Sequence, residues 1–151
     1  MKIVILGAGR IGSSLARNLS NSNYEVCIVD ENKNKLSELE DKLDIMTVEG
    51  SASHLNTLKK SGLDEDTIVL AVTSNDEVNI VACQIAKKAF DVKKTICRFR
   101  DNSYFGKLDI FGEGVIDIPI SPEDEITTHL KELIDHPGAN QIESFANGKV
   151  K

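Results

Sequence analysis

The stretch Gly7–Gly12, with the sequence GAGRIG, decides the fold of this chain. An apolar run, Ile3–Leu6, precedes it, and a segment with a helical pattern follows it. A buried strand, a glycine-rich turn and a helix in this order predict the nucleotide-binding turn of a Rossmann fold. In such a turn Gly7 permits the tight bend, Gly9 lets a pyrophosphate approach the backbone, and Gly12 lets the helix pack closely. The free N–H groups and the positive end of the helix would then face the phosphates.

An acidic residue stands at the end of the next expected strand, Glu25–Asp30. Asp30 follows the glycine turn at close to the ~20 residues expected for an acid that binds the ribose hydroxyls. A carboxylate at this position repels a 2′-phosphate, and Glu31 would add to the repulsion. The pair therefore favours NAD(H) or an adenine nucleotide over NADP(H). The alternative is that Asp30 only caps the helix that follows.

Composition limits the class of protein. The chain has 151 residues, a net charge of −6 and only 5% aromatic residues, which suits one α/β domain with an aliphatic core. No basic patch indicates nucleic-acid binding. Three cysteines without CxxC or metal spacing are typical of a reducing compartment. No apolar stretch is as long as a signal peptide core or a membrane span, so we expect a cytoplasmic protein.

Strand-like and helix-like segments alternate along the chain, which predicts a doubly wound, six-stranded parallel sheet. We expect strands at 3–6, 25–29, 45–48, 67–72, 95–99 and 115–118, and helices near 12–21, 32–42, 53–61, 75–89 and 102–110. In the fourth helix, one apolar face is expected to carry Val78, Val81, Ala82, Ile85, Ala86 and Ala89.

The C-terminal segment has a different pattern, so we divide the chain into a Rossmann domain, 1–118, and a connecting segment, 119–151. Ser121 with Pro122 predicts the start of an amphipathic helix that ends near His136. Asn147-Gly148 predicts a hairpin turn only three residues before the sequence ends. This pattern fits either a piece of a longer protein or a strand edge completed by a partner.

Two further loops are expected at the ligand edge of the sheet. Ser51 follows the third strand and would hydrogen-bond to a base, although Gly50–Ser53 is also explained as a turn with Ser53 capping the next helix. Thr73 and Ser74 follow the fourth strand, where their backbone would lie near ribose and phosphates. Ser74 also forms a capping-box pattern with Glu77, which is a sufficient structural reason for both residues.

Three arginines are candidate phosphate ligands. Arg98 and Arg100 alternate in the fifth strand, so both side chains would lie on one face near its carboxyl end. A buried arginine needs a partner, and that partner would be either a phosphate or a carboxylate. Arg10 lies in the first turn of the first helix, where its charge opposes the helix dipole unless an anion binds.

The histidines His54, His129 and His136 match no nucleophile or metal pattern. A hydride-transfer enzyme needs a further region that holds its substrate, and we find no such region in this chain. We therefore expect a binding protein without catalytic residues. The candidate cofactor-binding residues are Gly7, Ala8, Gly9, Arg10, Ile11, Gly12, Asp30, Ser51, Thr73, Ser74 and Arg98.

These motifs together resemble the N-terminal domain of TrkA-type proteins, the RCK or KTN subunits of potassium channels and uptake systems. The resemblance covers the whole chain. It rests on Met1–Gly12, Ile28–Asp30, Gly50–Ser53, Ala71–Asn79, Arg98–Arg100, Ile120–Glu123, Pro137–Ala139 and Phe145–Val150.

The resemblance implies a cytosolic, non-catalytic regulatory subunit that binds NAD⁺ or NADH, or in related subunits ATP or ADP. It also implies an integral-membrane potassium transporter as partner, and a homo-oligomer, a dimer or a ring, that gates potassium transport by conformational change. The dimer helices would carry Tyr104, Phe105, Leu108, Ile110, Phe111 and the stripe from Ile126 to Ile134. Such subunits usually continue into a C-terminal ligand-binding lobe, so this chain is either an excised domain or lacks the lobe. Two alternatives stay open: the coenzyme domain of a dehydrogenase separated from its substrate domain, and a free-standing redox-sensing module.

Overall fold

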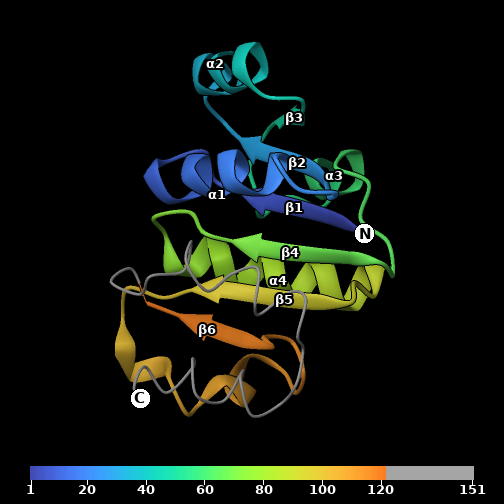
Figure 1. The fold of residues 1–151 in the computed structure, drawn as a ribbon. Coiled ribbons are helices and arrows are strands. Elements are labelled where there is room, and N and C mark those ends of the chain that lie inside the picture. Colours follow the sequence, from blue (N-terminus) through green and yellow to red (C-terminus); the bar gives the residue numbers. More distant parts are fainter. Residues whose placement is uncertain (122–151) are drawn as a thin grey trace.

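The computed structural model describes residues 1–121, which form a layered α/β structure around a central sheet (Figure 1). Its strands are β1 (Lys2–Leu6), β2 (Glu25–Asp30), β3 (Met46–Glu49), β4 (Thr67–Ala71), β5 (Lys94–Arg98) and β6 (Ile118–Ile120). Its helices are α1 (Arg10–Ser20), α2 (Lys33–Lys42), α3 (Leu55–Lys60) and α4 (Asp76–Phe90), with 3₁₀ turns η1 (Asn102–Tyr104) and η2 (Leu108–Phe111).

The described strands form one sheet in the order β3-β2-β1-β4-β5-β6, and each neighbouring pair is parallel. This arrangement confirms the predicted doubly wound Rossmann sheet. The strand order reverses between β1 and β4. In folds of this kind the ligand binds at that reversal, outside the carboxyl ends of the strands.

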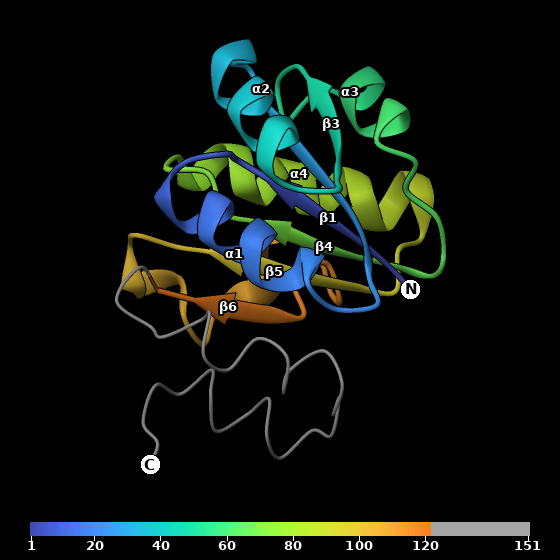
Figure 2. The ribbon, with the colours of Figure 1, turned by 45° about the horizontal axis from the view of Figure 1, so that its top comes forward.

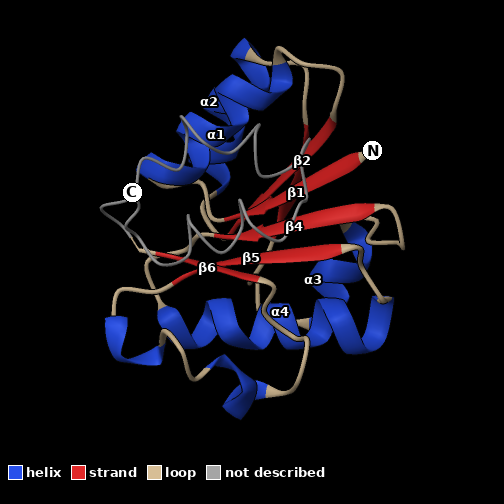
Figure 3. Ribbon diagram, turned by 60° about the horizontal axis from the view of Figure 1, so that its bottom comes forward, coloured by secondary structure: helices blue, strands red, loops and turns tan. Residues whose placement is uncertain are grey.

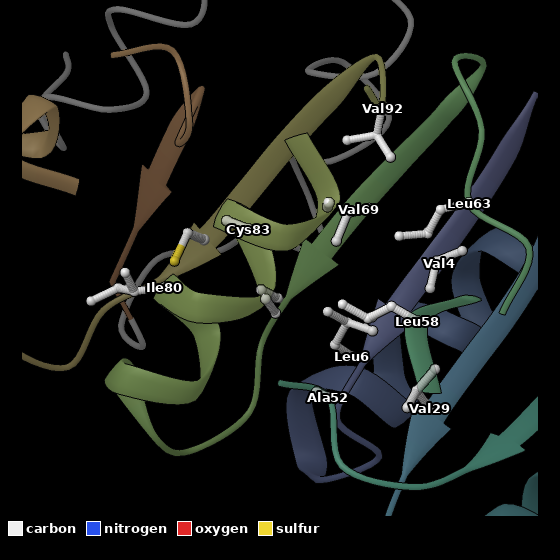
Figure 4. Close-up of a cluster of buried hydrophobic side chains, with 14 of the residues drawn as sticks. Val4, Leu6, Val29, Ala52, Leu58, Leu63, Val69, Ile80, Cys83 and Val92 are labelled. Atoms are coloured by element: carbon white, nitrogen blue, oxygen red, sulfur yellow. The ribbon is translucent and has the colours of Figure 1, made fainter. Parts of the chain in front are cut away.

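Two helix layers cover the sheet: α1 and α2 pack on one face, and α3 and α4 on the other (Figures 2 and 3). Successive residues of β1 serve the two layers, since Ile3 and Ile5 face the α1–α2 side and Val4 and Leu6 the α3–α4 side. Figure 4 shows the second of these clusters, in which side chains from the strands meet those of α3 and α4. Because the central strands are buried on both faces, their sequences are continuous apolar runs and do not alternate with polar residues.

The sixth strand lies further along the chain than predicted, at Ile118–Ile120 and not at 115–118. Val115 and Ile116 are buried, but they precede the strand. Polar groups take up the hydrogen bonds there: the Thr95 hydroxyl donates to the Val115 carbonyl, and the Asp117 carboxylate accepts from the Thr95 amide. The strand crosses the domain boundary that we expected after residue 118.

The predicted helix at 102–110 is replaced by the two 3₁₀ turns η1 and η2. Gly106 separates them with a φ of +85°, a left-handed conformation that ends a helix. Tyr104, Phe105 and Phe111 pack beside buried Phe99. Their rings therefore serve this domain's own core, whereas Ile110 is 67% exposed.

The buried face of α4 is also rotated from the predicted one. Its buried residues are Asn79, Ile80, Ala82, Cys83 and Ala86. Val81, which we placed on the inner face, is 38% exposed. The apolar band of the helix is wider than the face that packs on the sheet, so periodicity alone did not locate its centre.

The amphipathic helix and hairpin expected beyond Ser121 lie outside the described residues. None of the helices within residues 1–121 is both long enough and apolar enough to cross a membrane.

Candidate nucleotide-binding site

A pocket of about 260 Å³ lies at the carboxyl edge of the sheet, across the reversal in strand order. The ends of β1, β2, β3 and β4 each contribute to it. Its lining residues are Gly7, Val29, Asp30, Glu31, Gly50, Ser51, Ala52, Thr73, Asn75 and Val78. Four of the predicted contacts are therefore brought together in one cavity: Gly7, Asp30, Ser51 and Thr73.

The glycine turn has the geometry that its sequence predicts. Gly7 has a φ of +112°, and a Cβ built on it would lie 3.0 Å from the Thr73 Cα. A Cβ on Gly12 would lie 1.7 Å from the Gly7 carbonyl oxygen, so only glycine lets α1 approach β1 this closely. A Cβ on Gly9 would meet nothing within 4 Å. Gly9 is therefore needed neither for the turn nor for packing, and its bare backbone is open to a ligand.

The amino terminus of α1 differs from those of α2 and α4. Asn32 and Asn75 cap α2 and α4 through side-chain hydrogen bonds, but Gly9 gives α1 no side-chain cap. The first turn of α1 carries no acidic residue, unlike that of α4, which carries Asp76 and Glu77. The first N–H groups of a helix need acceptors and favour an anion. The start of α1, which includes Arg10, Ile11 and Gly12, is therefore a place where a bound anion would be favoured.

Asp30 bridges the glycine turn and the start of α2. Its Oδ1 accepts from the Ala8 amide at 2.8 Å, and its Oδ2 accepts from the Asn32 amide at 2.8 Å. The side chain that caps α2 is that of Asn32, so the alternative in which Asp30 only caps this helix is wrong. Each carboxylate oxygen keeps a further lone pair. Asp30 is thus held in place and can still accept from ribose hydroxyls.

The loop after β3 supplies small residues to the pocket. The Ser51 hydroxyl lies 3.2 Å from the Ser53 hydroxyl, and Ala52 is buried beside it. Gly50 has a φ of +157°, and a Cβ there would approach the Thr57 hydroxyl to 2.5 Å. Ser53 does not cap α3 as we predicted, because the helix begins one residue later and its cap residue is His54.

Residues of the loop after β4 line two different pockets. Thr73 lines the 260 Å³ pocket, whereas Ser74 lines a neighbouring pocket of about 280 Å³ together with Arg100 and Asp101. The expected capping box of Ser74 and Glu77 is wrong. The cap of α4 is Asn75, whose Oδ1 accepts from the Val78 amide at 3.0 Å.

Arg98, the last residue of β5, and Arg100, two residues beyond it, contact this loop. One guanidinium nitrogen of Arg98 donates to the Thr73 carbonyl at 3.2 Å and to the Val72 carbonyl at 3.4 Å. Arg100 donates to the Ser74 carbonyl at 3.4 Å. Both guanidinium groups therefore donate to main-chain oxygens of this loop, which fits the prediction that they lie on one side. Neither arginine lines the 260 Å³ pocket.

Arg10 lies on the other side of the glycine turn, in a pocket of about 350 Å³ between α1 and α2. Ala8 and Gly9 line the same pocket. Arg17, Lys35 and Lys42 surround it, with Glu38 as the acidic residue in its lining. The cations nearest the turn thus gather on its outer side, in a protein whose net charge is negative.

Sequence reasoning missed Asn79, a buried side chain in the first turn of α4. Its amide bonds to the loop after β4 and to the end of β5. A polar residue on the apolar side of a helix was the signal that could have revealed it, but the face that we predicted, from Val78 to Ala89, did not include Asn79.

The cysteines are not reactive groups of this site. Cys27, Cys83 and Cys97 are free and buried. Burial raises the pKa of Cys27 to about 11. A hydrogen bond with Cys83, together with burial, raises the pKa of Cys97 far above its ordinary value. Thiols in this state are poor nucleophiles.

Comparison with known proteins places the chain in a family. The TrkA-N domain model matches residues 3–122. The Trk system potassium uptake protein TrkA of Halomonas elongata is 41% identical over 153 residues, which covers 100% of this chain and 34% of the relative. The chain belongs to the TrkA-N domain family, and it spans about a third of the length of the curated relatives it matches.

Solved structures show the same fold. The TrkA-N domain of the Escherichia coli inner membrane protein ybaL superposes with a TM-score of 0.68 at 18% identity, covering 88% of this chain and 96% of that one. The GsuK channel bound to NAD superposes with a TM-score of 0.60 at 20% identity, covering 74% of this chain and 20% of that one. ChuY, an anaerobillin reductase from Escherichia coli O157:H7, has a TM-score of 0.70 at 13% identity, covering 93% and 94%. At these identities the likeness shows the fold alone, which an inner membrane protein, a channel and a reductase share.

Proposed function

We propose that this chain is the nucleotide-binding unit of a potassium-uptake regulator and that its ligand is NAD⁺ or NADH. The observation that carries the proposal is the pairing of an open Gly9 backbone at an uncapped helix with an acid fixed beside it. The family supplies the biological setting, because its curated members are named as potassium uptake proteins.

The pocket supports one arrangement of the ligand. Asp30 would accept the adenosine ribose hydroxyls, and the pyrophosphate would lie over Gly9 at the amino end of α1. The base would occupy the part of the pocket lined by Ser51, Ala52 and Val78. Arg10 would reach the phosphates from the outer side of the turn. ATP and ADP share the adenosine and diphosphate groups and would use the same contacts, whereas Asp30 and Glu31 disfavour the 2′-phosphate of NADP.

Regulation, and not catalysis, is the role that this lining favours. The ionisable side chains of the 260 Å³ pocket are Asp30 and Glu31, and the arrangement above uses Asp30 for the ribose. The ligand would act by binding one arrangement of a homo-oligomer better than another, at the cytoplasmic face of a membrane potassium transporter. Exposed Ile110 would contribute to the contact between copies. The sheet would transmit the difference from the pocket to that contact.

Calorimetric titration of the purified chain with NAD⁺, NADH, ATP, ADP and NADP⁺ tests the ligand. We expect saturable binding of at least one dinucleotide, with NADP⁺ weaker. Asp30→Ala should weaken binding by about tenfold or more, because a charge-assisted hydrogen bond to the ribose is lost. Glu65→Ala, an exposed acid outside the pocket, is the control of equal charge change.

Potassium uptake in cells tests the role. The wild-type and Asp30→Ala chains should be compared in the whole protein that carries them. Loss of nucleotide-dependent uptake in the variant is expected. Unchanged regulation in a variant that no longer binds nucleotide would show that the pocket serves another purpose.

A further inference from the structure

Asn79 is a polar side chain in the apolar layer between α4 and the sheet. It is fully buried, at 0% exposure, and lies in the first turn of α4. A buried amide is costly unless its hydrogen bonds are made. The partners that Asn79 has found therefore identify what it does.

The Asn79 side chain forms hydrogen bonds with Thr73, in the loop after β4, and with Arg98, the last residue of β5. Its Oδ1 accepts from the Thr73 amide at 3.0 Å and from the Thr73 hydroxyl at 2.7 Å. Its Nδ2 donates to the Thr73 carbonyl at 3.1 Å and to the Arg98 carbonyl at 3.0 Å. Two acceptor sites and two donors are the full capacity of an asparagine amide.

The residue that Asn79 holds is part of the nucleotide pocket. Thr73 lines the cavity, and its Cα would lie 3.0 Å from a Cβ on Gly7. The loop after β4 thus packs directly against the glycine turn, too closely for a side chain at Gly7. Any shift of Thr73 would open or close the gap in which a diphosphate and ribose must fit.

We propose that Asn79 is a positioning residue for nucleotide binding: it fixes the loop after β4 against the glycine turn and ties that loop to the end of β5. Asn79 acts through Thr73 and does not touch the ligand. Because Thr73 and Arg98 share one amide, a ligand that moves Thr73 also moves the last residue of β5. This inference rests on the proposed nucleotide function and adds a residue that determines the pocket's shape.

Thr95 provides a matched control at the other end of β5. It is equally buried, at 0% exposure, and its hydroxyl donates to the Val115 carbonyl at 2.6 Å. Thr95→Val removes this bond and the one that the hydroxyl accepts from the Asp117 amide, and Thr95 does not line the pocket. If the Asn79 variants bind weakly only because they are less stable, Thr95→Val should bind weakly too. If they bind weakly because the pocket has changed shape, Thr95→Val should keep its affinity.

The experiment compares Asn79→Ala, Asn79→Asp, Thr95→Val and the wild-type chain by calorimetry with NAD⁺ and NADH and by thermal unfolding. We expect about tenfold weaker binding for Asn79→Ala, and binding within about twofold of wild type for Thr95→Val. Asn79→Asp keeps the volume of the side chain but places an oxygen against the Thr73 and Arg98 carbonyls. It should bind at least as weakly as Asn79→Ala, whereas a side chain that only fills space would make the aspartate the milder change.

Amide hydrogen exchange at Thr73 gives a second readout that needs no ligand. We expect Thr73 to lose protection in the Asn79 variants and to keep it in Thr95→Val. Wild-type affinity in folded Asn79 variants, or unchanged Thr73 protection, overturns the proposal. If the wild-type chain itself binds no adenine nucleotide, the proposed function fails, and the exchange of Thr73 still decides whether Asn79 holds the loop.

Discussion

The two ends of the sheet use hydrogen-bonded polar groups for different purposes. At the amino end, Asp117 accepts from the Thr95 amide and from the Lys87 ammonium, and the Thr95 hydroxyl donates to the Val115 carbonyl. At the carboxyl end, Asp30 accepts from backbone amides of two loops, yet it faces a cavity.

The difference separates groups that stabilise the fold from groups that prepare a site. At the amino end the described groups bond to one another and tie the start of β5 to the segment before β6. At the carboxyl end the same kinds of bonds hold loops in place while leaving donors and acceptors available. Changes at the amino end should therefore affect unfolding, and changes at the carboxyl edge should affect binding. The glycine turn is the exception: Gly12 is needed for packing, whereas Gly9 leaves the backbone open to a ligand.

The largest expected effect tests that exception. Gly12→Ala would place a Cβ against the Gly7 carbonyl, which is backbone and cannot move aside. We expect a loss of roughly 3 kcal/mol or more in the free energy of unfolding, measured by urea denaturation.

Gly9→Ala is the matched variant in the same turn. Its φ of −76° suits alanine, and the added methyl meets no atom of the protein. Its stability should stay within about 1 kcal/mol of wild type, while NAD binding weakens by about tenfold or more because the methyl blocks the pyrophosphate. If the two substitutions lowered the free energy of unfolding equally, Gly9 would be needed for packing as Gly12 is, and the distinction between them would be wrong.

A smaller effect is expected at the amino end. Asp117→Ala leaves the Lys87 ammonium and the Thr95 amide without their carboxylate. Because both side chains of the ion pair are partly exposed, we expect a loss of about 1–2 kcal/mol in urea denaturation. NAD affinity should stay within about twofold of wild type. A large drop in affinity would mean that the two ends of the sheet are coupled.

The smallest effect concerns acid stability at the amino end. The Asp66 amide and the Thr67 hydroxyl hold the pKa of Asp64 below its ordinary value of 3.8. A carboxyl whose pKa is lower in the folded state stabilises the fold above its unfolded pKa, and this stabilisation is lost as the pH falls through the folded value. Asp64→Asn should therefore lower the urea midpoint at about pH 5 but differ less from wild type at about pH 3. A constant difference at both pH values would assign the effect to geometry and not to charge.

Local patterns in the sequence were sufficient for the framework. A doubly buried parallel strand needs a continuous apolar run, and a tight strand-to-helix turn needs glycines, so Ile3–Leu6 and Gly7–Gly12 predicted their own structure. Asp30 could be placed because its position depends only on the spacing within one strand-turn-helix-strand unit. The glycine, acid and loop residues of the pocket followed from the rule that parallel strands end at one edge.

Long-range contacts decided the rest. The start of β6 depends on hydrogen bonds between Thr95 and the segment around Asp117, and these residues meet only in the folded sheet. The buried face of α4 depends on how the helix rolls against β4 and β5, which a 3.6-residue period does not specify. Asn79 shows the limit most clearly. Its residue type is visible in the sequence, but its role comes from a loop residue, Thr73, and the last residue of β5, Arg98, which the fold brings within reach of one amide.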